Sequence, residues 1–390
     1  MNSRSGWWMI GLSLTALLLL IAVTVFFFRP HSQPVERIAV GSAMGNDDTA
    51  GYRRADAPRS FHFPVDHGPH PEFRNEWWYL TGNLADASGR RFGYQLTLFR
   101  IALAATPPVA DSAWRSHQMY MGHFALTDIA GGQHYGFERF SRGAVGLAGA
   151  QTTPFRVWLG DWELAGTDVN IFPLRLRARE GDIALDLTLN TTKPLVLQGD
   201  QGLSQKSAER GNASYYYSYT RLSTTGTIRL AERSFTVEGA SWLDREWSTS
   251  ALGPDQSGWD WFALQLDDGR DLMFYRLRRK DGTLDPHNAG TLVATDGSTR
   301  VLHWDEVDVQ PLGSWTSPHT GDRYSAGWRL RIPTEHLDLT VTPTIADQEM
   351  RLTIHYWEGA VMVNGRAGDQ AIHGQGYLEM TRYEPDTPIR

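Results

Sequence analysis

From about residue 60 onward, the chain is a series of short stretches in which apolar and polar residues alternate with a period of two. Such alternation puts one face of each stretch on a core and is typical of antiparallel strands. Turn pairs such as Asp268-Gly269 and Asp281-Gly282 separate the stretches, and helical spacing is scarce. The pattern predicts an all-β fold. The clearest examples are residues 92–100, 174–178, 183–189, 337–342 and 350–357.

A break in this pattern near residues 223–232 divides the strand-rich part into two halves. We therefore expect one domain over residues 60–225 and a second over residues 226–385, both of ordinary domain size. Each half is long enough to close into a barrel of about eight strands, which can hold one small ligand.

The beginning of the chain has a different character. Gly6 to Phe28 is an uncharged, mostly apolar run of 23 residues, enough for a helix to cross a membrane. It ends in bulky residues rather than the small residues of a cleavage site, which favours an uncleaved anchor. We predict a transmembrane segment within residues 1–30, inserted through residues 7–28, and a polar tether over residues 31–59. The body would then lie in the periplasm or outside the cell, held at the inner membrane.

Composition removes several classes of function. The net charge of −7 includes no extended basic field, so we expect no nucleic-acid partner. The absence of cysteine excludes disulfides, thiolate zinc sites and a cysteine nucleophile. No HExxH or GxSxG motif occurs, and we predict no metal and no cofactor. The 15 tryptophans suit both a core and a ligand cavity, since each has a large apolar ring and one N–H.

The sequence Glu76-Trp77-Trp78-Tyr79 mixes charge and aromatic rings on one expected strand. Glu76 and Trp78 would share one face, and Trp77 and Tyr79 the other. Neither face is plainly solvent-exposed. Glu76 either pairs with an arginine for structural reasons or lines a cavity as an acid, a base or a hydrogen-bonding group.

A second candidate strand carries Trp242, Asp244 and Glu246 on one face and Arg245 and Trp247 on the other. Two carboxylates beneath a tryptophan are costly unless they are paired or partly protonated. Repulsion and desolvation would raise one pKa, which is how a general acid is made. A buried salt-bridge network with arginines is the equal alternative.

Three further features complete the candidates. Gln201 lies in a glycine-bracketed loop that suits the rim of a pocket. Tyr215 and Tyr217 share one face of a tyrosine-rich strand and either stabilise a sheet or line a cavity. His123 is a possible partner for a catalytic carboxylate.

Nine blocks occur in order across residues 60 to 384, at residues 63–68, 75–83, 121–125, 193–194, 199–204, 215–218, 242–247, 258–262 and 374–380. Together they resemble the family that groups AttH-like secreted proteins with bacterial carotenoid 1,2-hydratases. The resemblance implies two lipocalin-like antiparallel β-barrel domains packed side by side, here preceded by one transmembrane helix. The hydratases add water to a terminal double bond of an acyclic carotenoid, which requires a carboxylic acid and sheltering aromatics. Fungal relatives assist cycloadditions. The AttH-like branch, called predicted secreted hydrolases, is associated with export ABC transporters, and this chain is similar to it, although Arg245 stands where many members are expected to have histidine.

Two functions follow, and a structural seam between the barrels is a third interpretation. The favoured one is a membrane-anchored protein that binds a lipid or other apolar ligand and works with an ABC transporter. The alternative is a hydratase or hydrolase acting on an apolar, isoprenoid-like substrate. Its catalytic candidates are Asp244, Glu246, Glu76 and His123. The ligand-binding candidates are Trp77, Trp78, Tyr79, Gln201, Tyr215, Tyr217, Trp242, Arg245, Trp247, Trp259 and Trp261.

Overall fold

The computed structural model describes residues 49–383, apart from residues 107–111, 168–169, 251 and 382. The chain divides into a unit of residues 1–37 and a unit of residues 38–390, and all described residues belong to the second. The predicted membrane segment over residues 1–30 lies outside the described residues. Among the residues that are described, no helix has both the length and the apolar character needed to cross a membrane.

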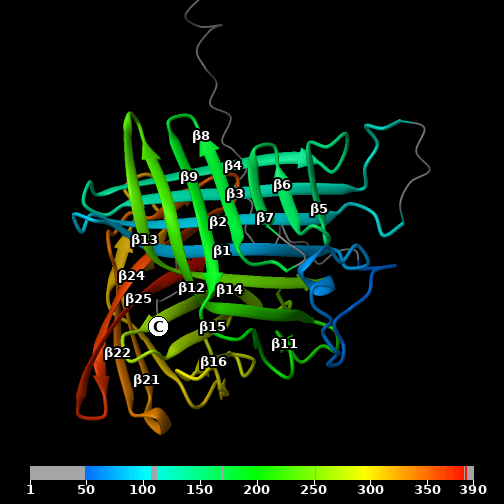
Figure 1. Cartoon of the computed structure of the whole chain (residues 1–390). Helices are drawn as coiled ribbons and strands as arrows, with labels where there is room; N and C mark the ends of the chain where they lie inside the picture. Colours follow the sequence, from blue (N-terminus) through cyan, green and yellow to red (C-terminus); the bar gives the residue numbers. More distant parts are fainter. Residues whose placement is uncertain (1–48, 107–111, 168–169, 251, 382, 384–390) are drawn as a thin grey trace, which may run out of the picture. The chain divides into compact units, whose positions relative to one another are not determined.

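The first sheet contains thirteen antiparallel strands of the described chain in the order β4-β3-β2-β1-β13-β12-β9-β8-β7-β6-β5, with β10 and β11 added to β12 (Figure 1). The sheet curls so that β6 approaches β2, β3 and β4, which gives it a barrel-like form. The strands are β1 (Asn75–Asp86), β2 (Arg91–Ala102), β3 (Gln118–Asp128), β4 (Gln133–Arg142), β5 (Ala148–Gln151), β6 (Arg156–Leu159), β7 (Trp162–Gly166), β8 (Leu174–Glu180), β9 (Ile183–Thr191), β10 (Val196–Leu197), β11 (Leu203–Gln205), β12 (Ala213–Leu230) and β13 (Arg233–Ser248).

The second sheet has ten antiparallel strands within the described residues, in the order β17-β16-β15-β14-β25-β24-β22-β21-β18, with β23 added to β24. Its strands are β14 (Gln256–Leu266), β15 (Asp271–Arg279), β16 (Ala289–Val293), β17 (Thr299–His303), β18 (Asp308–Pro311), β21 (Trp328–Ile332), β22 (Leu337–Pro343), β23 (Glu349–Arg351), β24 (His355–Ala367) and β25 (Gln370–Thr381). A small hairpin of β19 (Ser314–Thr316) and β20 (Arg323–Ser325) stands apart, and two short 3-10 turns cover Val65–His67 and Pro333–Glu335. The prediction of an all-β fold with two barrel-like sheets is confirmed.

The period-two pattern works as expected where one face of a strand meets solvent. In β8, Leu174 and Leu176 are fully buried, whereas Arg175 and Arg177 point outward and pair with Asp186. Burying each leucine contributes about 1.5–3 kcal/mol, and the outward charges keep the strand in register. A slip of one residue would exchange the two faces.

The two sheets do not divide where the sequence suggested. The predicted boundary between residues 225 and 226 falls inside β12, and β13 continues the first sheet. β12 and β13 form one long hairpin whose tight turn at residues 231–232, with Ala231 at a φ of 54°, resembles a linker in sequence. The change from one sheet to the other instead lies between Ser248 and Gln256.

The described end of the predicted tether belongs to the folded body. Ala55 is fully buried, and Tyr52 donates a hydrogen bond to the Ala102 carbonyl at 3.1 Å. Arg54 donates to the Gly211 carbonyl at 3.2 Å and pairs with Glu209 at 2.8 Å. The prediction of a free tether over residues 31–59 is therefore wrong from residue 49 onward, because these contacts fix a polar segment whose composition looked like a linker.

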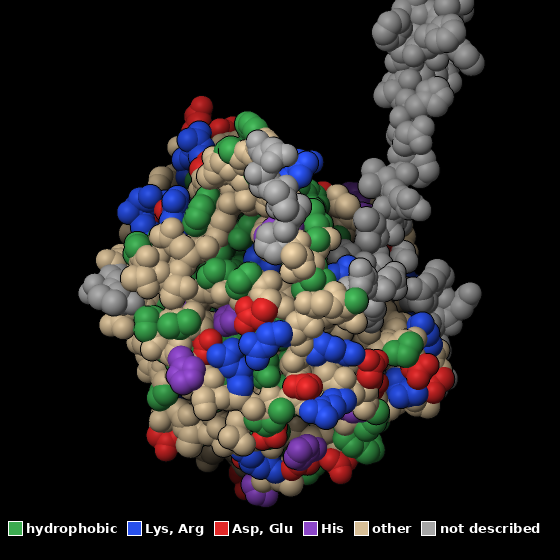
Figure 2. All heavy atoms as spheres, turned by 90° about the vertical axis from the view of Figure 1, so that its right-hand side faces the viewer, with side chains coloured by type: hydrophobic (Ala, Val, Ile, Leu, Met, Phe, Trp, Pro, Cys, Tyr) green, Lys and Arg blue, Asp and Glu red, His purple; other side chains and the backbone are tan. Residues whose placement is uncertain are grey.

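The sheets meet face to face along β1, β2 and β12 on one side and β14, β24 and β25 on the other. Asn83 of β1 donates to the Gly376 carbonyl of β25 at 3.0 Å. A side chain at Gly93 would come within 2.7 Å of the Ala360 Cβ, so the glycine permits the close approach. Elsewhere the surface is mixed in charge: basic and acidic side chains are interspersed on the face shown in Figure 2.

Candidate functional site

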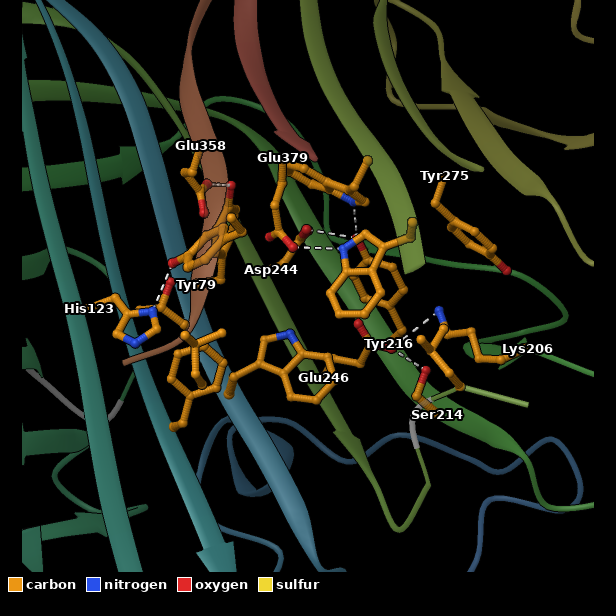
Figure 3. Close-up of a pocket in the computed structure, with 18 of the residues that line it drawn as sticks. Tyr79, His123, Lys206, Ser214, Tyr216, Asp244, Glu246, Tyr275, Glu358 and Glu379 are labelled. Carbon is orange, nitrogen blue, oxygen red and sulfur yellow. Dashed lines mark hydrogen bonds and ion pairs between the residues drawn. The ribbon is translucent and has the colours of Figure 1, made fainter. Parts of the chain in front are cut away.

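A cavity of about 140 Å³ lies at this seam, with walls from both sheets (Figure 3). A cavity of about this size holds a group comparable to benzene. The first sheet contributes residues of β1, β2, β3, β12 and β13, and the second contributes residues of β14, β15, β24 and β25. Its aromatic lining includes Trp77, Tyr79, Phe99, Tyr216, Trp259 and Trp261, and its ionisable lining includes His123, Lys206, Asp244, Glu246, Glu358 and Glu379.

The alternation along β1 decides which of its residues reach this cavity. Trp77 and Tyr79 line it, opposite Glu246 and Asp244 of β13 respectively. Trp78 points the other way, into the core of the first sheet. The two faces of this unusual strand thus serve different purposes.

Glu76 shares the inner face with Trp78 and has a structural environment. It is fully buried, forms ion pairs with Arg100 and Arg245, and accepts the His70 backbone N–H on both oxygens at 3.1 Å. Burial raises the pKa of Glu76, but the two guanidinium groups outweigh burial and hold that pKa well below its usual range. Glu76 is not among the residues that line the cavity. Glu76 was expected either to pair with an arginine or to line a cavity, and in the structure it pairs with arginines.

Asp244 faces the cavity and is held by three donors. Its Oδ1 accepts from Ser218 Oγ at 2.5 Å and Trp242 Nε1 at 2.7 Å, and its Oδ2 accepts from Tyr216 at 2.7 Å. Burial raises the pKa of Asp244 to about 7, and the three hydrogen bonds oppose this only in part. The Tyr216 hydroxyl in turn accepts from Trp261 Nε1 at 3.3 Å.

Two further carboxyl groups come from neighbouring strands of the second sheet. Glu358 of β24 and Glu379 of β25 stand directly opposite each other, and Tyr79 donates to Glu358. Like charges at opposite positions destabilise a sheet, so both groups do not ionise together. Burial and the Glu379 charge raise the pKa of Glu358 well above its ordinary value.

Glu379 is the more accessible member of this pair. Burial, together with the Glu246 and Asp244 charges, raises its pKa to about 7, while a hydrogen bond from Trp259 Nε1 at 2.6 Å opposes the shift. Its side chain is only partly buried, because it borders the cavity. Its second oxygen accepts no hydrogen bond from the described residues, so that oxygen is available to a ligand.

A charged pair occupies another part of the cavity. Lys206 Nζ lies 3.3 Å from Glu246 Oε1, which also accepts the Ser214 hydroxyl. Burial lowers the pKa of Lys206, but Glu246, Tyr275 and Asp244 together outweigh burial, and the net shift of the pKa is upward. In Figure 3, Lys206 and His123 lie at opposite sides of the site.

His123 is a neutral group. Burial lowers its pKa to about 3, and its Nδ1 shares a hydrogen bond of 2.7 Å with the Tyr356 hydroxyl. At neutral pH it carries no proton to donate as an imidazolium, so it is suited to positioning or accepting rather than to acid catalysis.

The folded body matches the family model described as AttH-like over residues 54–383. The chain belongs to the AttH-like family. It is similar to a crystal structure assigned to AttH from Nitrosomonas europaea, with 34% identity, a TM-score of 0.72, and coverage of 83% of this chain and 99% of the other.

Two more distant structures share the fold of this AttH-like protein. Kievitone hydratase from Nectria haematococca has 15% identity, a TM-score of 0.64, and coverage of 86% of this chain and 97% of its own. CghA with Sch210972 has 14% identity, a TM-score of 0.52 and the same coverages of 86% and 97%. A comparison with curated protein sequences finds no match. The expected resemblance to the AttH-like family is confirmed, and kievitone hydratase and CghA share its fold.

About half of the site candidates line the cavity of this AttH-like protein. Those that do are Trp77, Tyr79, His123, Asp244, Glu246, Trp259 and Trp261. Trp242 supports Asp244 from beside the wall. Those that lie elsewhere are Glu76, Trp78, Gln201, Tyr215, Tyr217, Arg245 and Trp247.

Of the two alternatives for Tyr215 and Tyr217, the structure has the one in which they stabilise the fold outside the cavity. Tyr215 donates to the Ala57 carbonyl at 2.9 Å, and Tyr217 shares a hydrogen bond of 2.6 Å with His67, so both pack beneath the chain segment before β1. Tyr216, one step along, reaches the cavity. Gln201 is an exposed turn residue with a φ of 52°.

Arg245 and Trp247 follow the same alternation as Glu76. Arg245 is fully buried, with its guanidinium 3.9 Å from the Trp78 ring centroid. Trp247 stacks on the His70 ring at a centroid distance of 3.8 Å. Both belong to the network under Glu76 and not to the cavity.

Residues that the sequence did not single out complete the wall. A sequence signal for two of them was available, because Glu358 and Glu379 are each a lone carboxyl group beside apolar and aromatic residues. These stretches are Tyr356-Trp357-Glu358 and Leu378-Glu379-Met380. The missed lining residues with ionisable groups are Lys206, Tyr216, Tyr275, Tyr356, Glu358 and Glu379.

One group in the second sheet has the composition of a metal site. Asp322, Glu349 and His355 each place a ligand atom within 4.8 Å of the others. Glu349 already accepts hydrogen bonds from Ser317 at 2.6 Å and Tyr324 at 3.1 Å. None of these three residues lines the cavity, and we assign no metal to them.

Proposed function

We propose that this AttH-like protein is an acid–base enzyme that adds water to, or removes water from, a largely apolar small molecule. The observation that supports it is the set of carboxyl groups with raised pKa values, Asp244, Glu358 and Glu379, beside an aromatic cavity. A carboxyl with a pKa near neutrality is poised to give up and regain a proton at the working pH.

The energetics of the buried carboxyl groups favour an acid–base enzyme over a protein that only carries a lipid. Burying a carboxyl group without full hydrogen bonding costs about 1–3 kcal/mol, and aliphatic side chains would bind an apolar ligand without that cost. One oxygen of Glu379 at the cavity accepts no hydrogen bond from the part of the chain that the structure describes. Functional sites are where such costs are tolerated. A lipid-binding role linked to an ABC transporter therefore ranks second.

Glu379 is the proposed acid. Its free oxygen delivers a proton to one carbon of a double bond, forming a C–H bond and leaving a cation at the adjacent carbon. The faces of Trp77, Trp259 and Trp261 stabilise that cation by about 0.5–2 kcal/mol per ring in suitable contact.

Asp244 is the proposed base. A water molecule attacks the cation and forms the C–O bond, and its surplus proton passes to the Asp244 carboxylate. The proton then returns to Glu379 through solvent, so the enzyme is unchanged after each turnover. The reverse sequence removes water from an alcohol, as microscopic reversibility requires.

We also infer that residues 7–28 anchor the enzyme in the inner membrane with its body on the periplasmic side. The apolar run in the sequence supports this. Fractionation of cells that express the full chain, with alkaline extraction of membranes and protease treatment of spheroplasts, tests both points. Release by alkali, or protection of the body from protease, would contradict them.

Turnover is tested with the full chain in detergent micelles and a panel of acyclic isoprenoid alkenes in oxygen-18 water. Hydration adds the mass of one labelled water to a substrate. Glu379→Gln and Asp244→Asn are expected to lower the rate by about 10²–10⁴-fold while melting near the wild-type temperature. Full activity in either variant would contradict the assigned role.

A further inference from the structure

The Lys206–Glu246 pair has no part in the proton transfers, yet it borders the same cavity. Lys206 and Glu246 are mostly enclosed, with side chains 15% and 9% exposed. Lys206 Nζ also donates to Ser204 Oγ at 2.9 Å. Figure 3 shows the pair beside Tyr216, with Tyr275 nearby.

Each partner has hydrogen-bonding capacity left over. An ammonium group has three N–H donors, and within the described residues those of Lys206 have only Ser204 and Glu246 as acceptors. Oε1 of Glu246 receives both Lys206 and Ser214, while its Oε2 accepts no hydrogen bond from the described chain. One cationic donor and one anionic acceptor therefore border the same space.

Only some ligand groups suit such a pair. A carboxylate or phosphate would accept from Lys206 but be repelled by Glu246. A hydrocarbon would leave both groups unsatisfied. A hydroxyl group accepts from an N–H and donates to a carboxylate at once. The rings of Tyr216 and Tyr275, whose centroids lie 5.5 and 4.2 Å from Nζ, provide an apolar surface for the rest of the ligand.

We propose that Lys206 and Glu246 form a hydroxyl-recognition subsite, so that the ligand is an apolar molecule bearing an alcohol or phenol group. As a statement about the substrate, this rests on the proposed hydratase function. Lys206 and Glu246 hold the hydroxyl while a different group, Glu379, protonates the carbon, and the subsite thus fixes which bond meets the acid.

Sites built to hydrogen-bond a hydroxyl reject analogues that lack it, in favourable cases by 10⁴–10⁵-fold. A small probe held by one subsite is expected to show a smaller preference, of about tenfold or more. The probes are para-fluorophenol and para-fluorotoluene, which differ in the hydroxyl and have similar size. Fluorine NMR on the full chain in micelles gives both affinities, with protein-free micelles correcting for partition.

The test variant replaces both partners, Lys206→Met with Glu246→Gln, so that no unpaired charge stays buried. Wild type is expected to prefer para-fluorophenol by about tenfold or more, and the double variant is expected to lose that preference while binding para-fluorotoluene as before. Tyr217→Phe, whose side chain lies on the other face of β12 and outside the cavity, is the matched control and keeps the preference.

Equal affinities in wild type, binding of neither probe, or a preference retained by the double variant would each overturn the subsite. These readouts need no turnover. A preference that is present in a protein without hydration activity would refute the proposed function alone, and hydration without a preference would refute the subsite alone.

Discussion

Glu358 and Glu379 stand opposite each other on β24 and β25, and Tyr79 from the first sheet donates a hydrogen bond to Glu358. The acid pair of the second sheet is thus held by a residue of the first. The site exists only where the two sheets meet, and its protonation state depends on that contact.

Stability should fall as pH rises because of these groups. The pKa values of Asp244 and Glu379 are about 7 in the folded chain, above their ordinary values near 4. Each group therefore contributes stability that is fully present below its unfolded pKa and is lost as pH rises through its folded pKa. Between pH 5 and pH 8, the free energy of unfolding of wild type should fall by roughly 2–3 kcal/mol more than that of Glu379→Gln, which lacks the titrating acid. Urea unfolding at the two pH values measures this, and an equal difference at both would contradict the raised pKa.

Tyr216→Phe should raise the pKa of Asp244 further. The tyrosine hydroxyl donates to the carboxylate at 2.7 Å and lowers that pKa, so its removal favours the protonated form. The limb of the pH–rate profile that reports Asp244 as base should move to higher pH, by about one unit. Tyr217→Phe is the matched control on the other face of β12 and should leave that limb in place.

Glu76→Gln should destabilise the protein without acting on the chemistry directly. It leaves Arg100 and Arg245 buried without their shared carboxylate, and breaking such a buried pair typically costs 3–5 kcal/mol. Chemical denaturation at neutral pH gives the value. A loss below about 1 kcal/mol would show that Glu76 is not the structural centre of this network.

Much of the fold could be predicted from the sequence because β8 and similar strands have one solvent-facing side and one buried side. The hairpin turn at residues 231–232 could not be told from a domain linker, since both are short and polar. For the site, alternation correctly grouped Asp244 with Glu246. It could not say which face of β12 meets the second sheet, and both faces are buried there.

The two cavity glutamates that the sequence did not indicate show the same limit of prediction. Glu358 and Glu379 lie far along the chain from Asp244, and their proximity depends on how two sheets pack rather than on spacing within one strand. Nothing local in the sequence distinguishes them from a buried glutamate that is neutralised by arginine, which is what Glu76 proves to be.

The proposed chemistry requires a carboxylic acid in the cavity that is protonated near neutral pH. Infrared difference spectroscopy of wild type against Glu379→Gln, followed as a function of pH, reports the carbonyl stretch of that acid. We expect a protonated-carboxyl band that disappears with a midpoint near pH 7. A band that is already absent at pH 5, the behaviour of an ordinary glutamate, would contradict it.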